Sequence, residues 1–116
     1  MELEILQKYS QSQLYEILEA SFEDGGLGAI PQNDKEKSEK GYYRFIRILK
    51  QTREDLCKSN QFQELLRNQK KYKKLEAAAV VSDIIISITG MATLSVFTFS
   101  LILISYGLDT ICSKKG

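Results

Sequence analysis

The residues that usually carry enzyme chemistry are scarce in this chain of 116 residues. Histidine is absent, which removes histidine-based acid–base catalysis, the common serine and cysteine triads and most zinc sites. The carboxylates fall on polar helix faces, and no pattern indicates a paired, desolvated couple. We therefore expect no enzymatic activity, no metal and no cofactor.

The two cysteines and one glycine-rich stretch are the remaining candidates for chemistry. The stretch Gly25–Gly28 lacks the Gly-Lys-Ser/Thr ending of a phosphate loop, and no predicted strand precedes it. Cys57 and Cys112 lie on either side of a long apolar segment. If that segment spans a membrane, the two thiols do not pair within one chain. We expect Cys57 to be a small packed residue in a reducing compartment. For Cys112 we expect a packed thiol, with lipidation or cross-linking of two copies as alternatives.

Hydroxyl side chains concentrate in one uncharged stretch, Ile84–Gly107, where seven of 24 residues are Ser or Thr. Small and hydroxyl residues permit close approach and hydrogen bonds between membrane helices. We therefore predict that copies of the chain associate through this stretch. The alternative is that the hydroxyls bond to carbonyls of their own helix. The predicted self-association residues are Ser87, Thr89, Gly90, Thr93, Ser95, Thr98, Ser100 and Ser105, and Asp83 is the predicted acid at the membrane entrance.

The distribution of charge predicts the element that carries these hydroxyls. The chain holds 16 Lys and Arg and 15 Asp and Glu, yet residues 84–107 hold none. A helix of this length spans about 36 Å, more than the roughly 30 Å hydrocarbon core of a bilayer. A buried helix in a soluble core is the alternative, but only about 90 other residues would have to surround it. We therefore predict one transmembrane segment at 77–112, with its core at 84–107 and a short tail at 113–116.

A hairpin of two spans is a weaker alternative. It would need about 40 apolar residues and a turn, whereas the apolar stretch Ala77–Cys112 has 36 residues and contains Asp83. Orientation follows from five basic residues before the span against two after it, which predicts a cytoplasmic N-terminus in a plasma or inner membrane. The five form a predicted juxtamembrane helix at 61–76: Arg67, Lys70, Lys71, Lys73 and Lys74. We expect topology signalling first and lipid contact second, and no nucleic-acid binding, since only Tyr72 is interleaved with them.

Residues 1–60 predict a small helical domain. Apolar spacing predicts a helix that begins at a capping box of Ser10 and Gln13 and ends near Glu23, where Gly25 and Gly26 stop it. Residues 24–41 hold three glycines and the only proline in their first half, which predicts a flexible loop, although the next helix has an alternative start at Asn33. Residues 42–57 predict an amphipathic helix. The apolar face of this helix comprises Tyr42, Phe45, Ile46, Leu49 and Leu56. A further capping box, at Asn60 and Gln63, is predicted to begin the helix that follows.

Charge is also uneven within this domain. Residues 1–24 carry six acidic groups and one Lys, whereas residues 35–58 carry eight basic and four acidic groups. The two helices are expected to attract each other within one chain or between copies, where head-to-tail contacts build rings or filaments. Ordinary solvated faces are the alternative. The predicted interaction residues are Arg44, Arg47, Lys50 and Arg53.

These elements predict an all-α fold of about three helices, the last of which runs unbroken from about Gln61 to Gly107 into a membrane. In layout the chain resembles small bacterial membrane effectors, in which a helical sensing or adaptor domain precedes a membrane segment. We expect an oligomerising effector whose clustered spans perturb or permeabilise the bilayer when the helices assemble or bind a partner. A tail-anchored adaptor and a holin-like or toxin-like pore former are the alternatives. The expected partners are membrane lipids, further copies of the chain and a second protein.

Overall fold

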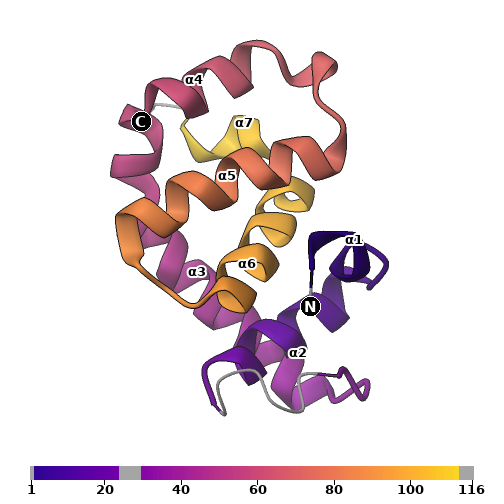
Figure 1. Cartoon of the computed structure of the whole chain (residues 1–116). Helices are drawn as coiled ribbons and strands as arrows, with labels where there is room; N and C mark the ends of the chain where they lie inside the picture. Colours follow the sequence, from indigo (N-terminus) through magenta and orange to yellow (C-terminus); the bar gives the residue numbers. More distant parts are fainter. Residues whose placement is uncertain (1, 24–29, 113–116) are drawn as a thin grey trace.

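Helices follow one another through residues 2–23 and 30–112, which are the residues that the computed structural model describes. No strand occurs among them, and the predicted all-α class is confirmed. In chain order (Figure 1) the elements are α1 (Leu3–Leu6), α2 (Gln11–Ser21), α3 (Lys35–Lys58), α4 (Asn60–Arg67), the 3-10 helix η1 (Gln69–Lys71), α5 (Lys74–Thr89), α6 (Thr93–Tyr106) and α7 (Leu108–Ile111).

The start of α2 is set by a local side-chain signal. Ser10 Oγ accepts a hydrogen bond from the Gln13 N–H at 3.2 Å, and Gln13 Oε1 accepts one from the Ser10 N–H at 2.9 Å. This reciprocal pair satisfies two N–H groups that have no partner within the helix. The predicted capping box is therefore confirmed. The glycines predicted to end this helix lie outside the described residues.

Two other helix starts differ from the prediction. The helix α3 begins at Lys35 because the Asp34 carboxylate accepts a hydrogen bond from the Lys37 N–H at 3.1 Å. The second half of the predicted 24–41 loop is therefore helical, and the alternative start at Asn33 is wrong. The capping box predicted at Asn60 is also wrong: Ser59 caps α4, and its Oγ accepts the Phe62 N–H at 3.2 Å.

The helices α2 and α3 are in close contact at Gly41. A side chain there would overlap the backbone carbonyl of Tyr15. The buried face of α3 accordingly includes Gly41, Ile48 and Thr52, and Tyr42 lies outside it with an exposed ring. The predicted apolar face is therefore correct for the residues that point into the core. It is wrong at its edge, where Tyr42 is exposed.

Replacing Gly41 with alanine is expected to lower the free energy of unfolding by about 2 kcal/mol. The overlap of the added methyl group with the Tyr15 backbone destabilises the fold by about 3 kcal/mol. The better helix propensity of alanine offsets about 1 kcal/mol of this loss. Urea denaturation followed by circular dichroism measures the difference. Lys40→Ala, on the exposed neighbour, should leave the stability nearly unchanged. Equal stability of the two variants would show that the helices do not meet at this position.

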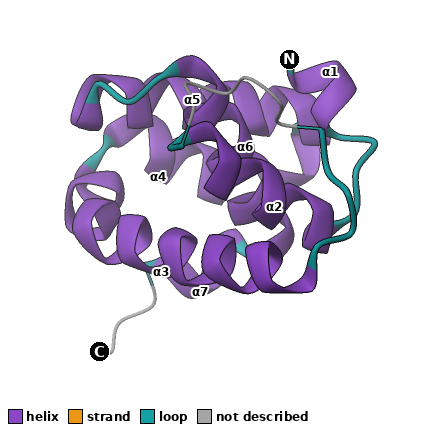
Figure 2. Ribbon diagram, turned by 90° about the horizontal axis from the view of Figure 1, so that it is seen from below, coloured by secondary structure: helices purple, strands orange, loops and turns teal. Residues whose placement is uncertain are grey.

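The helix α6 is the centre of the core. It contains no charged residue, and eight of its residues are buried. It packs against α1, α2 and α5. The centre of the Phe99 ring of α6 lies 5.1 Å from the centre of the Phe45 ring of α3. Figure 2 shows α6 in the interior of the bundle, with α3 and α5 on opposite sides. A helix that is apolar on every side suits either a membrane or an enclosing core, and here neighbouring helices enclose it.

The uncharged stretch is divided between two helices. Gly90 adopts a left-handed backbone with φ 69°, and its N–H donates to the Ile86 carbonyl at 2.9 Å, which ends α5. Gly107, with φ 116°, ends α6. The structure therefore does not support the predicted single transmembrane helix over Ile84–Gly107. Among residues 2–23 and 30–112, no helix combines the length and the apolar character needed to cross a membrane.

The predicted unbroken helix from Gln61 is also interrupted near its start. Asn68 leaves the helical region with φ −121° and ψ 29°, so α4 ends at Arg67. The chain then passes through η1 and the extended residue Tyr72 before α5 begins. The predicted juxtamembrane helix at 61–76 is therefore a helix, a turn and the first residues of a second helix.

Cys57 and Cys112 form a disulfide that joins the end of α3 to the residue after α7. Their Cα atoms lie 5.6 Å apart across a sequence separation of 55 residues. Beside the bond, the Arg53 side chain donates a hydrogen bond from Nε to the Ile111 carbonyl at 2.7 Å. The expectation of unpaired thiols was wrong because it placed them on opposite sides of a membrane, whereas α6 and α7 return the chain to α3.

Candidate interaction surface

Five basic side chains gather where the chain turns from α4 into α5. Arg67 is the last residue of α4, and the others lie in η1 or at the start of α5. All five are exposed. None of them forms a salt bridge with any other described residue. We call this group the basic turn: Arg67, Lys70, Lys71, Lys73 and Lys74.

Side-chain hydrogen bonds hold the backbone of the basic turn in place. Gln69 Nε2 donates to the Asp109 carboxylate at 2.8 Å, which ties η1 to α7. Glu76 Oε1 accepts the Lys73 N–H at 2.9 Å and so caps the start of α5. The backbone is fixed by uncharged and acidic neighbours, and the five cations are not engaged by any other residue that the structure describes.

Two shallow grooves flank the basic turn. A groove of about 420 Å³ lies along residues 66–71 and is lined by the turn itself. The other, of about 580 Å³, lies between α4 and α5, and we call it the α4–α5 groove. Lys71 of the basic turn lines it, and Tyr72, Ala79 and Val80 give it an apolar wall. Its remaining lining residues are Glu64, Asn68 and Glu76.

The predicted basic face of α3 is used partly within the chain. Arg44 Nε donates to Glu19 Oε1 at 2.8 Å, and its guanidinium lies 4.4 Å from the centre of the Phe22 ring. Arg53 contacts the carbonyl of Ile111, as described above. Arg47 and Lys50 are exposed. One predicted attraction between the acidic and basic helices therefore occurs inside a single chain, and contacts between copies stay a prediction.

Most of the hydroxyls predicted to join separate copies make hydrogen bonds within the chain. Ser95 Oγ lies 2.7 Å from Ser21 Oγ of α2, and Ser100 Oγ lies 3.0 Å from Ser82 Oγ of α5. These two pairs connect helices across the core. Ser87, Thr89 and Thr98 donate to carbonyls of their own helices, Gly90 ends α5, and Thr93, Ser105 and Asp83 are exposed.

Sequence reasoning missed two features of the folded chain. The disulfide depends on the path of α6 and α7, which no local pattern encodes. Glu16 is only 3% exposed although it is a carboxylate. Its burial depends on the residues after Ile30, which fold back over α2. No sequence signal distinguishes it from Glu19, which pairs with an arginine.

Comparison with known proteins assigns no family to the chain. No family model matches it, and neither the curated proteins nor the solved structures include a significant match. The function is therefore inferred from the charge and the shape of the surface alone.

Proposed function

We propose that this chain is a non-enzymatic interaction domain that docks an acidic segment of a partner protein. The observation that carries the proposal is a group of five exposed cations that form no ion pair with another described residue, beside a groove with an apolar wall. Acidic side chains of the partner meet the basic turn, and one apolar side chain enters the α4–α5 groove. Complementary charge guides such encounters, and a desolvated apolar anchor supplies much of the affinity.

A protein partner fits this surface better than a lipid bilayer does. Basic membrane-binding surfaces commonly place large apolar side chains next to the cations, where they enter the headgroup region. Among the described residues, the exposed large apolar side chains all lie outside the basic turn. A nucleic acid is also a poorer fit, because Tyr72 is half-buried and offers no stacking platform.

Reversing two charges in the basic turn tests the proposal. The probe is a fluorescent amphipathic peptide of Glu and Leu residues, and its affinity for the full chain is measured by anisotropy. We expect Lys70→Glu with Lys71→Glu to weaken binding at least about tenfold, which corresponds to about 1.4 kcal/mol. The matched control, Arg47→Glu with Lys50→Glu, makes the same change of charge on the exposed face of α3 and should leave the affinity within about twofold.

Equal weakening in both variants would mean that only net charge matters, and it would overturn the proposal. Vesicles containing phosphatidylserine and a short DNA duplex serve as competing probes. Tighter binding to either one than to the peptide would assign the basic turn to that other class of partner.

The oligomerising membrane effector expected from the sequence is a second candidate function. The hairpin formed by α5 and α6 favours it, because the stretch from Ile84 to Gly107 carries no charge. This function requires the hairpin to leave the bundle and to associate with other copies, since in the folded chain Ser95 contacts Ser21 of α2 and Ser100 contacts Ser82 of α5. Release of a trapped dye from the same vesicles supports this candidate. Binding without release opposes it.

A further inference from the structure

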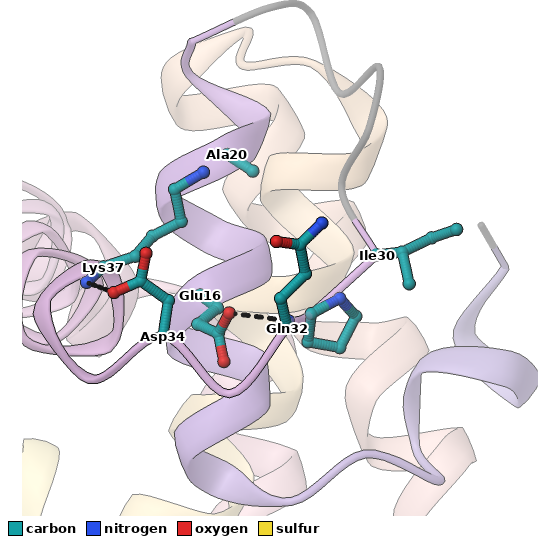
Figure 3. Close-up of a pocket in the computed structure, with 7 residues that line it drawn as sticks. Glu16, Ala20, Ile30, Gln32, Asp34 and Lys37 are labelled. Atoms are coloured by element: carbon teal, nitrogen blue, oxygen red, sulfur yellow. Dashed lines mark hydrogen bonds between the residues drawn. The ribbon is translucent and has the colours of Figure 1, made fainter.

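A small pocket lies between α2 and the segment that leads into α3 (Figure 3). Its volume is about 70 Å³. Glu16 and Ala20 of α2 form one wall, and the segment after Ile30 forms the other. In Figure 3 the Ile30 side chain points away from Glu16. The polar side chains that line the pocket are those of Glu16, Gln32, Asp34 and Lys37.

Glu16 is the unusual member of this pocket. Its carboxylate Oε1 accepts a hydrogen bond from the Gln32 N–H at 2.9 Å. Its other oxygen, Oε2, is buried without a hydrogen-bond partner, the only such side-chain atom among the described residues. A buried carboxylate oxygen that lacks a partner costs free energy, because it has given up its hydration. A hydrogen-bond donor that a ligand brings to this oxygen would offset that cost.

The charges around the pocket favour a cationic ligand. The Asp34 carboxylate adds a second negative group, and its hydrogen bond to the Lys37 N–H holds it at the start of α3. The Lys37 ammonium does not neutralise Glu16, because it pairs with Glu23 at 3.3 Å. The pocket thus combines a deeply buried carboxylate with a second one nearby, while Lys37, the cation among its described lining residues, pairs with Glu23.

We propose that this pocket binds a primary ammonium group, with the Glu16 carboxylate as its ion-pair partner. An ammonium group has three N–H donors and needs only a few acceptors, which Glu16, Asp34 and the Gln32 side chain provide. A calcium ion takes six to eight oxygens, and no cluster of three or more metal-binding side chains occurs among the described residues. The volume admits a terminal ammonium and its methylene group, whereas a quaternary ammonium lacks the N–H donors.

Thermal unfolding of the full chain tests this site with four probes: ethylammonium, Nα-acetyl-lysine amide, tetramethylammonium and calcium. We expect ethylammonium to raise the melting temperature in a saturable way and tetramethylammonium to have no effect. The effect should disappear in Glu16→Gln and persist in Glu36→Gln, which removes the same charge from the exposed first turn of α3. A rise with the lysine amide identifies a lysine side chain as a source of the ammonium, and a rise with ethylammonium alone identifies a free amine.

Three results would overturn the proposal: no saturable effect of either amine, an equal effect in Glu16→Gln, or a larger effect of calcium. If Glu16→Gln does not fold, the Gln32 amide provides a second measurement, because it bonds to the same carboxylate. Its NMR signal should shift in a saturable way with ethylammonium and stay unchanged with tetramethylammonium. If the Gln32 amide signal shifts with neither compound, the proposed ammonium site is excluded.

Discussion

Phe99→Ala is expected to lower the free energy of unfolding by about 4 kcal/mol, because it removes a large ring from the centre of the core. Phe99 belongs to α6 and is fully buried, and the centre of its ring lies 5.1 Å from the centre of the Phe45 ring. Neighbouring helices hold the surrounding side chains, so the cavity can collapse only in part. Urea denaturation of the full chain, followed by circular dichroism, measures the loss.

Phe97→Ala is the matched control for this prediction. Phe97 lies two residues earlier on the same helix and is only partly buried, so its loss should cost less than half as much. Two equal effects would contradict the packing of α6, since they would mean that both rings have similar surroundings. The comparison therefore tests whether the uncharged stretch forms the core of the folded chain.

Removing the disulfide is expected to cost a similar amount, about 4 kcal/mol, for a closed loop of this length. The bond joins Cys57 to Cys112 across 55 residues of sequence, so its loss enlarges the conformational freedom of the unfolded chain. The double variant Cys57→Ala with Cys112→Ala should unfold at a lower urea concentration than the oxidised chain. Adding a reductant to the natural sequence should lower the midpoint in the same direction.

The double alanine variant also provides the control for the reductant, which should not change its unfolding midpoint. A reductant that leaves the natural chain equally stable would show that the two thiols are not joined. A disulfide that resists reduction would also be evidence about the redox compartment of the chain, because such bonds survive mainly in oxidising compartments. The sequence alone had suggested a reducing environment for Cys57.

Local signals in the sequence predicted the class of fold and one helix start. The spacing of apolar residues identified helices, and the Ser10 capping box is present as predicted. These features depend on residues three or four positions apart, so the sequence displays them directly. Boundaries that depend on a choice between adjacent caps, such as Ser59 and Asn60, were missed by one residue.

The uncharged stretch shows where pattern reasoning failed. Length and lack of charge are equally typical of a membrane helix and of a helix enclosed by others. Gly90 was treated as a small packing residue within a continuous helix, but its left-handed backbone ends α5. The remaining helix, α6, is short enough for α1, α2, α3 and α5 to surround. The expectation that about 90 residues could not surround the whole stretch did not allow for its division at Gly90.

The basic turn was predictable in composition but not in shape. Its five cations are close together in the sequence, so they lie near one another in space whatever the local structure is. The α4–α5 groove follows from the interruption at Asn68, which folds the two helices against each other. The pocket at Glu16 joins residues from α2 and from the segment before α3, and a contact of that kind is set by the whole fold.

NMR mapping on the full ¹⁵N-labelled chain is the most direct test of the proposed docking surface. The chain is titrated with the unlabelled acidic amphipathic peptide, and the amide signals are followed residue by residue. We predict saturable shifts at Asn68, Lys71, Tyr72, Ala79 and Val80, which line the α4–α5 groove, and little change at Arg47 and Lys50 on α3. Shifts centred on α3, or no saturable shift at the groove, would contradict the account.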